Sequence, residues 1–301
     1  MNLDIDTLKK KFGKNLIINE NLSKYSWFNL GGPADIFFRP ENKEQLVLFL
    51  KTINEKYKVN ILGAGSNTLI RDLGVEGAVI KLGSKFSDIK LVDKETIEVG
   101  AAALDRKVSN FAKDNGISQM EFLSCIPGSI GGAIIMNSGC YGSEISEILT
   151  AIKILDKNGL EREIKSNEIN FFYRGSDIPN DYIILSARLK GISSSKKNIE
   201  KKQEELIKKK KDSQPSQIKT CGSTFKNKDN KKAWMLIKES GCDKLNVGDA
   251  KISEKHCNFF VNDGKAKSSE IELLINKVKK KVQSKTGINL ELEIKIIGNE
   301  K

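Results

Sequence analysis

The spacing of apolar residues along the chain alternates between a helical period and a strand period, which predicts an α+β protein. In the helical segments, apolar residues recur every three to four positions. In the strand segments, short apolar runs are bounded by glycine and polar residues. Helices are predicted at 43–57, 104–115, 231–240 and 269–286, and strands at 59–62, 78–82, 96–99 and 182–190. Gly116, Gly241 and Gly287 directly follow three of these helices, as C-terminal caps commonly do.

Three further segments carry local structure signals. Asn158-Gly159 separates two alternating stretches and predicts a hairpin. The polar run at 192–198 is typical of a linker and leads into a lysine-rich helix. The final alternating stretch predicts a half-buried strand, with Leu290, Leu292, Ile294 and Ile296 on one face and Glu291, Glu293 and Lys295 on the other.

The net charge of +12 over 301 residues raises the question of a polyanionic partner. The lysines concentrate at 196–211 and 277–285, where they interleave with Glu, Leu and Ile at helical spacing and without aromatic residues. Base stacking would need exposed aromatic rings, so we interpret both runs as solvated helix faces and expect no nucleic-acid partner.

The cysteine pattern and the N-terminal sequence bear on the cellular compartment and on the presence of a zinc site. The chain has five cysteines, no C-x-x-C pair and one histidine, His256, so we expect no zinc site of the His/Cys kind. The N-terminus lacks the apolar stretch of a signal peptide, and no apolar run approaches the roughly 18 residues of a membrane span. We therefore expect free thiols in a reducing cytoplasm and no membrane association.

Two glycine- and serine-rich loops indicate close contact with a ligand. GAGSN at 63–67 follows a predicted strand and could form an anion-binding turn, although Thr68 at the sixth position breaks the dinucleotide fingerprint and a plain tight turn remains open. IPGSIGGA at 126–133 brings a proline and several small residues together, which a structural turn rarely needs. Two such loops would suit the two halves of a pyrophosphate-bearing cofactor such as FAD.

Three polar side chains are candidates for chemistry. Arg174, within FFYRGSD, could pair with a carboxylate or phosphate, or could stack on its aromatic neighbours. Ser223, within CGSTFKN, follows a glycine and could instead be an ordinary loop serine. No histidine lies nearby in the sequence, which argues against a hydrolase triad, and His256 is the only histidine that could activate Cys221 as a nucleophile. Glu293, taken alone, is an ordinary polar residue on a half-buried strand.

Taken together, these segments resemble the UDP-N-acetylenolpyruvoylglucosamine reductases, the FAD enzymes of peptidoglycan precursor synthesis. The resemblance covers about residues 22–298, and the order and spacing of its motifs all fit. The motifs are SWFNLGGPAD at 26–35, ILGAGSNTLI at 61–70, IPGSIGGA and MNSGCYG within 126–142, YRGS at 173–176, CGSTFKN at 221–227, AWMLIKESGC at 233–242, ISEKHCNFFVN at 252–262 and ELEIKIIG at 291–298. Trp27-Phe28 and the ending EIK are similar to the alphaproteobacterial branch.

The resemblance implies a two-part FAD-binding region of the vanillyl-alcohol-oxidase type and a C-terminal α+β substrate-binding domain. We expect the boundaries 1–85, 86–195 and 196–301. The resemblance implies NADPH as co-substrate, a UDP-linked amino sugar as substrate, non-covalent FAD and no obligate protein partner. The implied residues are catalytic Arg174, Ser223 and Glu293; flavin-binding Gly63, Ala64, Gly65, Ser66, Asn67, Pro127, Gly128, Ser129, Gly132, Ala133 and Asn137; and substrate-binding Lys226 and Asn227.

The implied reaction reduces an enolpyruvyl ether to a lactyl ether, with hydride passing from NADPH by way of FAD. Arg174 would stabilise the enolate, Ser223 would donate the proton, and Glu293 would act in its protonated form.

The sequence departs from the family at two of its motifs. Lys295 stands where many relatives have Arg, and Lys228 stands where many have Pro. The chain also lacks the tyrosine-bearing loop of one subclass. The rival interpretations are a related alcohol or lactone oxidase, a basic nucleic-acid-binding protein and a flavin-free scaffold relic.

Overall fold

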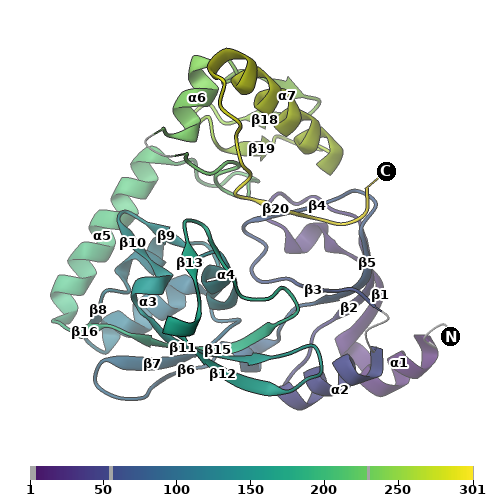
Figure 1. The fold of residues 1–301 in the computed structure, drawn as a ribbon, viewed down its shortest axis with the longest axis vertical. Helices are drawn as coiled ribbons and strands as arrows, with labels where there is room; N and C mark the ends of the chain where they lie inside the picture. The colour runs from purple at the N-terminus through teal and green to yellow at the C-terminus, as the bar shows by residue number, and fades with distance from the viewer. Residues whose placement is uncertain (1–4, 54–56, 229–230, 301) are drawn as a thin grey trace. The chain divides into compact units, whose positions relative to one another are not determined.

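The computed structural model describes residues 5–53, 57–228 and 231–300 (Figure 1). The chain folds into two compact units. The first unit comprises Met1–Ile18, Ile36–Ala64 and Gly77–Lys210, and the second comprises Asn19–Asp35, Gly65–Glu76 and Lys211–Lys301. The chain therefore passes between the units several times. The three-part division at residues 85 and 195 stays a prediction.

The elements confirm a mixed α+β composition. The helices are α1 (Ile5–Phe12), α2 (Lys43–Ile53), α3 (Asp105–Asp114), α4 (Ile130–Ile135), α5 (Lys196–Ser213), α6 (Ala233–Glu239) and α7 (Ser268–Thr286). The strands are β1 (Leu16–Asn21), β2 (Pro33–Phe38), β3 (Val59–Ile61), β4 (Thr68–Ile70), β5 (Val75–Ile80), β6 (Ile89–Leu91), β7 (Thr96–Gly100), β8 (Ile117–Ser118), β9 (Gly139–Cys140), β10 (Ser143–Glu144), β11 (Leu149–Leu155), β12 (Glu161–Lys165), β13 (Phe171–Phe172), β14 (Gly175–Ser176), β15 (Ile183–Lys190), β16 (Ile192–Ser193), β17 (Asn246–Val247), β18 (Ala250–Ile252), β19 (Phe260–Asn262) and β20 (Lys295–Ile297).

A five-stranded antiparallel sheet of order β12-β11-β15-β7-β6 organises the first unit. Its predicted hairpin is confirmed, because β11 pairs with β12 and Gly159 adopts φ +76° in the turn. Asp156 fixes that turn by accepting the N–H groups of Asn158 and Leu160. Short helix α4 packs on β7 and β15 of the same sheet (Figure 1). The sheet and α4 together support the segment that carries the second glycine loop.

Three phenylalanine rings join α1, β2 and α2 within the first unit. Phe38 and Phe49 stack with ring centroids 4.1 Å apart, and Phe12 meets both rings edge-on at 5.1 and 5.4 Å. Such aromatic pairs contribute about 0.5–1.5 kcal/mol each beyond their burial. They anchor the helices beside a second sheet, of order β1-β2-β5-β3, in which β3 pairs in parallel with β5 and then leads into the first glycine loop.

Both lysine-rich runs are helices with one buried face, as predicted. In α5 the buried residues are Ile199, Gln203 and Leu206, and the lysines between them lie outside the core. In α7 the buried residues likewise recur at helical spacing, and Gly287 follows with φ +73°. Among the described residues, no helix combines the length and the apolarity that crossing a bilayer requires.

The second unit packs α6 and α7 with the three-stranded sheet β17-β18-β19 (Figure 1). Its core includes Phe225 and Phe260, both fully buried, whose rings meet edge-on at 5.8 Å. Strand β20 pairs in parallel with β4, over Lys295–Ile297 and Thr68–Ile70. This pairing brings the C-terminal segment beside the residues that follow the first glycine loop.

The terminal strand is shorter than predicted. Regular pairing is confined to β20, and Leu292 makes only an isolated bridge with Phe225. The predicted alternation persists at the two ends of the segment, where Leu290 and Ile294 are buried and Glu291 and Lys295 are exposed, but Leu292 and Glu293 are both half-buried. The reason is that residues 291–293 face the irregular segment 224–226, which offers separate hydrogen bonds and no continuous ladder.

Several other predicted boundaries were wrong. The expected linker at 192–198 contains β16, which pairs with β8, and helix α5 begins at Lys196. The strand expected at 78–82 begins at Val75, because Gly77 with φ +85° interrupts the alternation that marks a strand. Helix α2 ends at Ile53, Tyr57 is not helical, and residues 54–56 lie outside the described residues.

Candidate active site

The first glycine loop begins in the first unit, where Gly63 leaves β3. Lys81 donates a hydrogen bond to the carbonyl of Gly63. A Cβ atom on Gly63 would lie 2.8 Å from Oγ of Ser129, closer than side chains pack. A side chain at Gly63 would therefore displace the Ser129 hydroxyl where the first loop meets the second. Burial lowers the pKa of Lys81, and the nearby charge of Arg39 lowers it further.

The rest of this loop, Gly65–Asn67, belongs to the second unit. Gly65 adopts φ +70°, and a Cβ atom there would collide with the carbonyl oxygen of Tyr25. The carbonyl of Gly65 accepts the N–H of Trp27 at 3.0 Å. Ser66 and Asn67 are half-buried. This tight turn leaves no room for a side chain at Gly65.

The second glycine loop runs antiparallel to the segment before α3. Ile130 and Gly131 donate their N–H groups to Ala103 and Ala101, at 3.0 and 2.9 Å. Ser129 is buried at the start of α4, whereas Pro127 and Gly132 are exposed. Within the described ranges, a Cβ atom on Gly132 would meet only the Ser129 hydroxyl, at 3.9 Å. Gly132 thus presents open space beside the point where the two loops meet.

Asn137 closes this segment and is almost wholly enclosed. It adopts φ +41° and is 1% exposed. Its amide nitrogen donates to the carbonyl of Phe172 at 3.3 Å, and its oxygen accepts the N–H of Ser146 at 3.1 Å. Both ends of the amide therefore bind backbone. A direct flavin contact by Asn137 stays a prediction.

Asp105 is a candidate that the sequence reasoning missed. It is the first residue of α3 and is completely buried, and neither carboxylate oxygen has a hydrogen-bond partner within the described parts of the chain. A Cβ atom on Gly128 would lie 2.5 Å from its Oδ2 atom. Burial raises the pKa of Asp105 well above its ordinary value. The second loop therefore rests on a buried acid, which nothing in the local sequence pattern signals.

Arg174 lies in the turn between β13 and β14, with φ +57°. Its Nη2 atom donates to the carbonyl of Gly139 at 2.8 Å, and its guanidinium lies 4.9 Å from the ring centroid of Tyr173. Ser176, in the same hairpin, donates to Ile135 of α4 at 3.1 Å. The Tyr173 ring and the Gly139 carbonyl therefore orient a half-buried cation beside the segment that follows the second loop, and pairing of Arg174 with a carboxylate or phosphate stays a prediction.

In the second unit, Ser223 and Glu293 lie on neighbouring segments. The N–H of Glu293 donates to the carbonyl of Thr224 at 2.9 Å, and the N–H of Lys226 donates to Glu291 at 2.8 Å. Ser223 and Glu293 are both half-buried. The two predicted catalytic residues of this unit are thus brought together by backbone pairing.

Asn67 connects the first glycine loop to the same segment. Its amide nitrogen donates to the carbonyl of Glu293 at 3.0 Å, and its own carbonyl accepts the N–H of Lys295 at 2.9 Å. Glu293 is consequently held between Asn67 on one side and Thr224 on the other. A predicted flavin-binding residue and a predicted catalytic residue thus share one hydrogen-bonded group with Thr224, the residue that follows Ser223.

The predicted substrate-binding residues follow on the Ser223 segment. Lys226 is half-buried and Asn227 is exposed. The side-chain oxygen of Asn227 accepts the N–H of Ala233 at 2.9 Å, so it caps the start of α6. This cap fixes the end of the segment.

Cys221 packs against the first loop and is poorly suited to attack a substrate. It is 2% exposed, and its sulfur lies 3.3 Å from the carbonyl oxygen of Thr68 and 3.6 Å from that of Gly65. Burial raises the pKa of its thiol to about 11. The protonated thiol supports the prediction that Cys221 is not a nucleophile.

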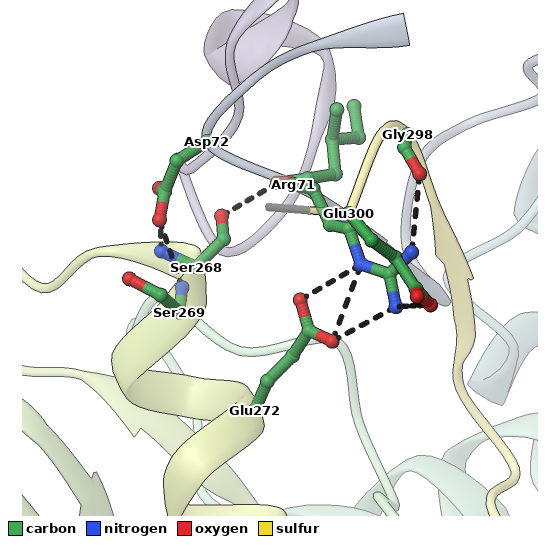
Figure 2. Close-up of polar contacts among 8 residues, drawn as sticks. Arg71, Asp72, Ser268, Ser269, Glu272, Gly298 and Glu300 are labelled. Atoms are coloured by element: carbon green, nitrogen blue, oxygen red, sulfur yellow. Dashed lines mark hydrogen bonds and ion pairs between the residues drawn. The ribbon is translucent and has the colours of Figure 1, made fainter.

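A polar cluster holds the C-terminal segment to α7 and to the residues after β4 (Figure 2). The Arg71 guanidinium binds Glu272 through two nitrogens at 3.1–3.2 Å and donates to Gly298 at 3.1 Å. Ser268 and Ser269 are the first two residues of α7, and the Asp72 carboxylate accepts hydrogen bonds from their N–H groups at 2.8 and 2.9 Å. These contacts support the pairing of β20 with β4, and so the place of Glu293.

Comparison with known proteins assigns both parts of the chain. A model of the C-terminal domain of UDP-N-acetylenolpyruvoylglucosamine reductase matches residues 214–297, and a model of an FAD binding domain matches residues 34–165. These matches confirm the predicted α+β fold with an FAD-binding region and a separate C-terminal domain.

Individual relatives agree with the family models. The chain is 47% identical over 297 residues to a UDP-N-acetylenolpyruvoylglucosamine reductase of Pelagibacter ubique, covering 98% of each chain. It is 43% identical to the Gluconobacter oxydans protein of the same name, covering 94% of this chain and 92% of that one. A crystal structure of the reductase from Thermus caldophilus superposes with a TM-score of 0.82 at 32% identity, covering 94% and 98% of the two chains.

Proposed function

Because the chain belongs to the UDP-N-acetylenolpyruvoylglucosamine reductase family, we propose that Arg174, Ser223 and Glu293 carry out the reaction of that family here. The chain is an FAD-dependent oxidoreductase that reduces the enolpyruvyl group of UDP-N-acetylglucosamine-enolpyruvate to give UDP-N-acetylmuramate, with NADPH as co-substrate. The observation that carries the residue assignment is the hydrogen-bonded group of Asn67, Glu293 and the Ser223 segment.

The two glycine loops fit FAD. A side chain on Gly63 would meet Ser129, and Gly132 is exposed and unobstructed, so backbone N–H groups can approach a pyrophosphate closely. The residues that would hold FAD are Gly63, Ala64, Gly65, Ser66, Asn67, Pro127, Gly128, Ser129, Gly132, Ala133 and Asn137. Bound FAD would supply the hydride chemistry, accepting hydride from NADPH and passing it to the vinyl carbon of the substrate.

Arg174 is suited to stabilise the enolate that develops on the substrate carboxylate. Its planar guanidinium can bind a carboxylate through two N–H groups, and such a pair is stronger in a site that excludes water. The bond to Gly139 and the ring of Tyr173 already restrict its orientation. Less reorganisation is then needed when charge builds up on the substrate.

Ser223 is proposed to donate the proton that completes the reduction. A serine hydroxyl is a weak acid, but it can protonate a strongly basic carbanion that lies within hydrogen-bonding distance. Gly222 precedes it with φ +78°, and none of the described residues lies within 4 Å of its Cβ position, so a substrate could approach this part of the chain. The pairing with Phe259 limits the freedom of the Ser223 backbone.

Glu293 is proposed to act in its uncharged form. An ionised carboxylate beside the enolate would repel it, whereas a protonated one can donate a hydrogen bond to it. Its half-buried place between Asn67 and Thr224 supports this role. Isotope-edited infrared spectroscopy of the substrate complex would show a protonated carboxyl band, and a carboxylate band at neutral pH would refute the assignment.

Lys226 and Asn227 are proposed to bind the UDP-linked amino sugar. The oxygen of Asn227 already caps α6, so its contact with the substrate would come from the amide nitrogen. We place the enzyme in the cytoplasm, and the five unpaired cysteines support a reducing compartment. The proposal includes no nucleic-acid, membrane or obligate protein partner.

The reaction can be tested directly on the purified protein. The preparation should be yellow, with absorbance near ~450 nm from oxidised flavin. Under anaerobic conditions it should oxidise about one equivalent of NADPH per flavin by itself, and should turn over continuously only when the enolpyruvyl nucleotide sugar is present. A colourless preparation that binds DNA in a salt-sensitive manner, or an oxidase that acts on alcohols or lactones, would contradict the proposal.

A further inference from the structure

The segment that carries Ser223 depends on the side chain of Asn258. The Oδ1 atom of Asn258 accepts the N–H of Phe225 at 3.0 Å, and its Nδ2 atom donates to the carbonyl of Phe225 at 2.8 Å. The backbone carbonyl of Asn258 accepts the N–H of Thr224 at 2.7 Å. Three hydrogen bonds from one residue therefore fix the two residues that follow Ser223.

This clamp takes the place of a regular strand neighbour. Residues 223–226 make only isolated bridges, through Ser223 with Phe259 and through Phe225 with Leu292. Without a continuous ladder, the two backbone groups of buried Phe225 would have no partner if the Asn258 amide were removed. A buried backbone group without a hydrogen-bond partner destabilises the folded state, so the segment would shift to recover its hydrogen bonds.

Asn258 is itself held firmly. It is 3% exposed, and its N–H donates to Nδ1 of His256 at 3.3 Å. Burial lowers the pKa of His256, so its ring is neutral and can accept that bond at neutral pH. The ring of His256 in turn meets Phe259 edge-on, with centroids 4.9 Å apart. Packing of His256 and Phe259 therefore holds Asn258, and with it the three hydrogen bonds to residues 224 and 225, in place.

We propose that Asn258 is a positioning residue for proton transfer, which sets the place of the Ser223 hydroxyl through the backbone of Phe225. The inference rests on the proposed role of Ser223. Asn258 acts only through its neighbour, because both ends of its amide bind Phe225. A displacement of about 1 Å at a reacting group can cost about a hundredfold in rate, so the effect should be large.

The test measures the two half-reactions of the holoenzyme separately. Asn258→Ala should leave flavin reduction by NADPH near the wild-type rate and slow reoxidation by the enolpyruvyl substrate about 10- to 100-fold. In a Ser223→Ala background the same substitution should cause little further slowing, because the group that it positions is gone. If Asn258→Ala does not fold, Asn258→Asp keeps the acceptor for the Phe225 N–H and loses the donor, and it should show the same asymmetry between the half-reactions.

Asn262→Ala is the matched control. Asn262 is 4% exposed in the same unit and also makes three hydrogen bonds, to Phe28, Gly264 and Ala266. It should lower the free energy of unfolding by a similar amount and leave the ratio of the two half-reaction rates unchanged.

The outcomes separate the inference from the proposed function. If Ser223→Ala reoxidises at the wild-type rate, the role of Ser223 fails, and the inference fails with it. If Ser223→Ala is slow but the Asn258 variants reoxidise normally, only the inference is overturned. Equal slowing of both half-reactions, or the same asymmetry in Asn262→Ala, would show a purely structural role and also overturn it.

Discussion

Replacing Arg71 with methionine would remove the hydrogen bonds that join three segments of the second unit (Figure 2). Methionine keeps most of the apolar length of the side chain and loses the guanidinium. The lost contacts are those with Glu272 and Gly298 and the ion pair with Glu300 at 3.0 Å. Strand β20 begins two residues after Glu293, and its pairing with β4 would lose the support of these contacts.

The expected cost follows from the exposure of each partner. The side chains of Arg71 and Glu272 are 21% and 24% exposed, so their paired hydrogen bonds are only partly screened. Hydrogen bonds to charged groups contribute about 1.5–3 kcal/mol, which predicts a loss of about 2 kcal/mol in Arg71→Met. Glu300 is 79% exposed, and its ion pair should contribute at most ~0.5 kcal/mol. Arg71→Lys keeps the positive charge but loses the paired N–H donors of the guanidinium, and it should lower the free energy of unfolding by about 1 kcal/mol.

Urea unfolding of the three variants would measure these costs. Arg71→Met, Arg71→Lys and Glu300→Ala should lower the free energy of unfolding in that descending order. The reasoning would be wrong if Arg71→Met unfolded like the wild type, or if Glu300→Ala cost as much as Arg71→Met.

Three further predictions concern single side chains. The pKa of Asp72 is lowered because hydrogen bonds from the first N–H groups of α7 outweigh the effect of its burial. Asp72→Asn should therefore lower the free energy of unfolding in urea by about 1 kcal/mol at pH 7. This difference should disappear as the pH falls through the lowered pKa, which lies below the unfolded value of ~3.9. Gly132→Ala should not destabilise the flavin-free protein in urea unfolding, because the added Cβ has room and alanine favours helix α4. It should weaken FAD binding about tenfold in a fluorescence titration, and unaltered affinity would remove Gly132 from the flavin site. Cys125 should react with iodoacetamide at pH 7 faster than Cys221 in peptide mapping, because its interaction with the neighbouring Cys140 thiol lowers the pKa of Cys125 while burial raises that of Cys221 to about 11. Equal rates would contradict this difference.

Local signals in the sequence predicted the elements whose conformation depends on a few neighbouring residues. The hairpin at Asn158-Gly159 and the end of α7 at Gly287 both require a left-handed backbone that glycine adopts readily, and both predictions are confirmed. The two glycine loops were also recognisable, because several small residues in a row are rarely needed for a turn alone. The family resemblance supplied the roles of Arg174, Ser223 and Glu293, which no single motif could have given.

Features that depend on distant segments were not predictable. The irregular end of the terminal strand depends on residues 224–226, which face it across the second unit. Asp105 lies in none of the motifs, and Asn258 lies within ISEKHCNFFVN without a local signal of its role; only the structure reveals that Asp105 lies against Gly128 and that Asn258 binds the backbone of Phe225. The assignment of residues 65–76 to the second unit is likewise a consequence of pairing with the C-terminal segment, which no local pattern encodes.

The most direct test of the account is an anaerobic stopped-flow measurement on Ser223→Ala. The account predicts that NADPH reduces the bound flavin within about twofold of the wild-type rate, because Ser223 takes no part in that half-reaction. Reoxidation of the flavin by the enolpyruvyl nucleotide sugar should slow by about 10²- to 10⁴-fold, the usual contribution of a positioned acid. Wild-type reoxidation, or equal slowing of both half-reactions, would contradict the claim that Ser223 donates the proton.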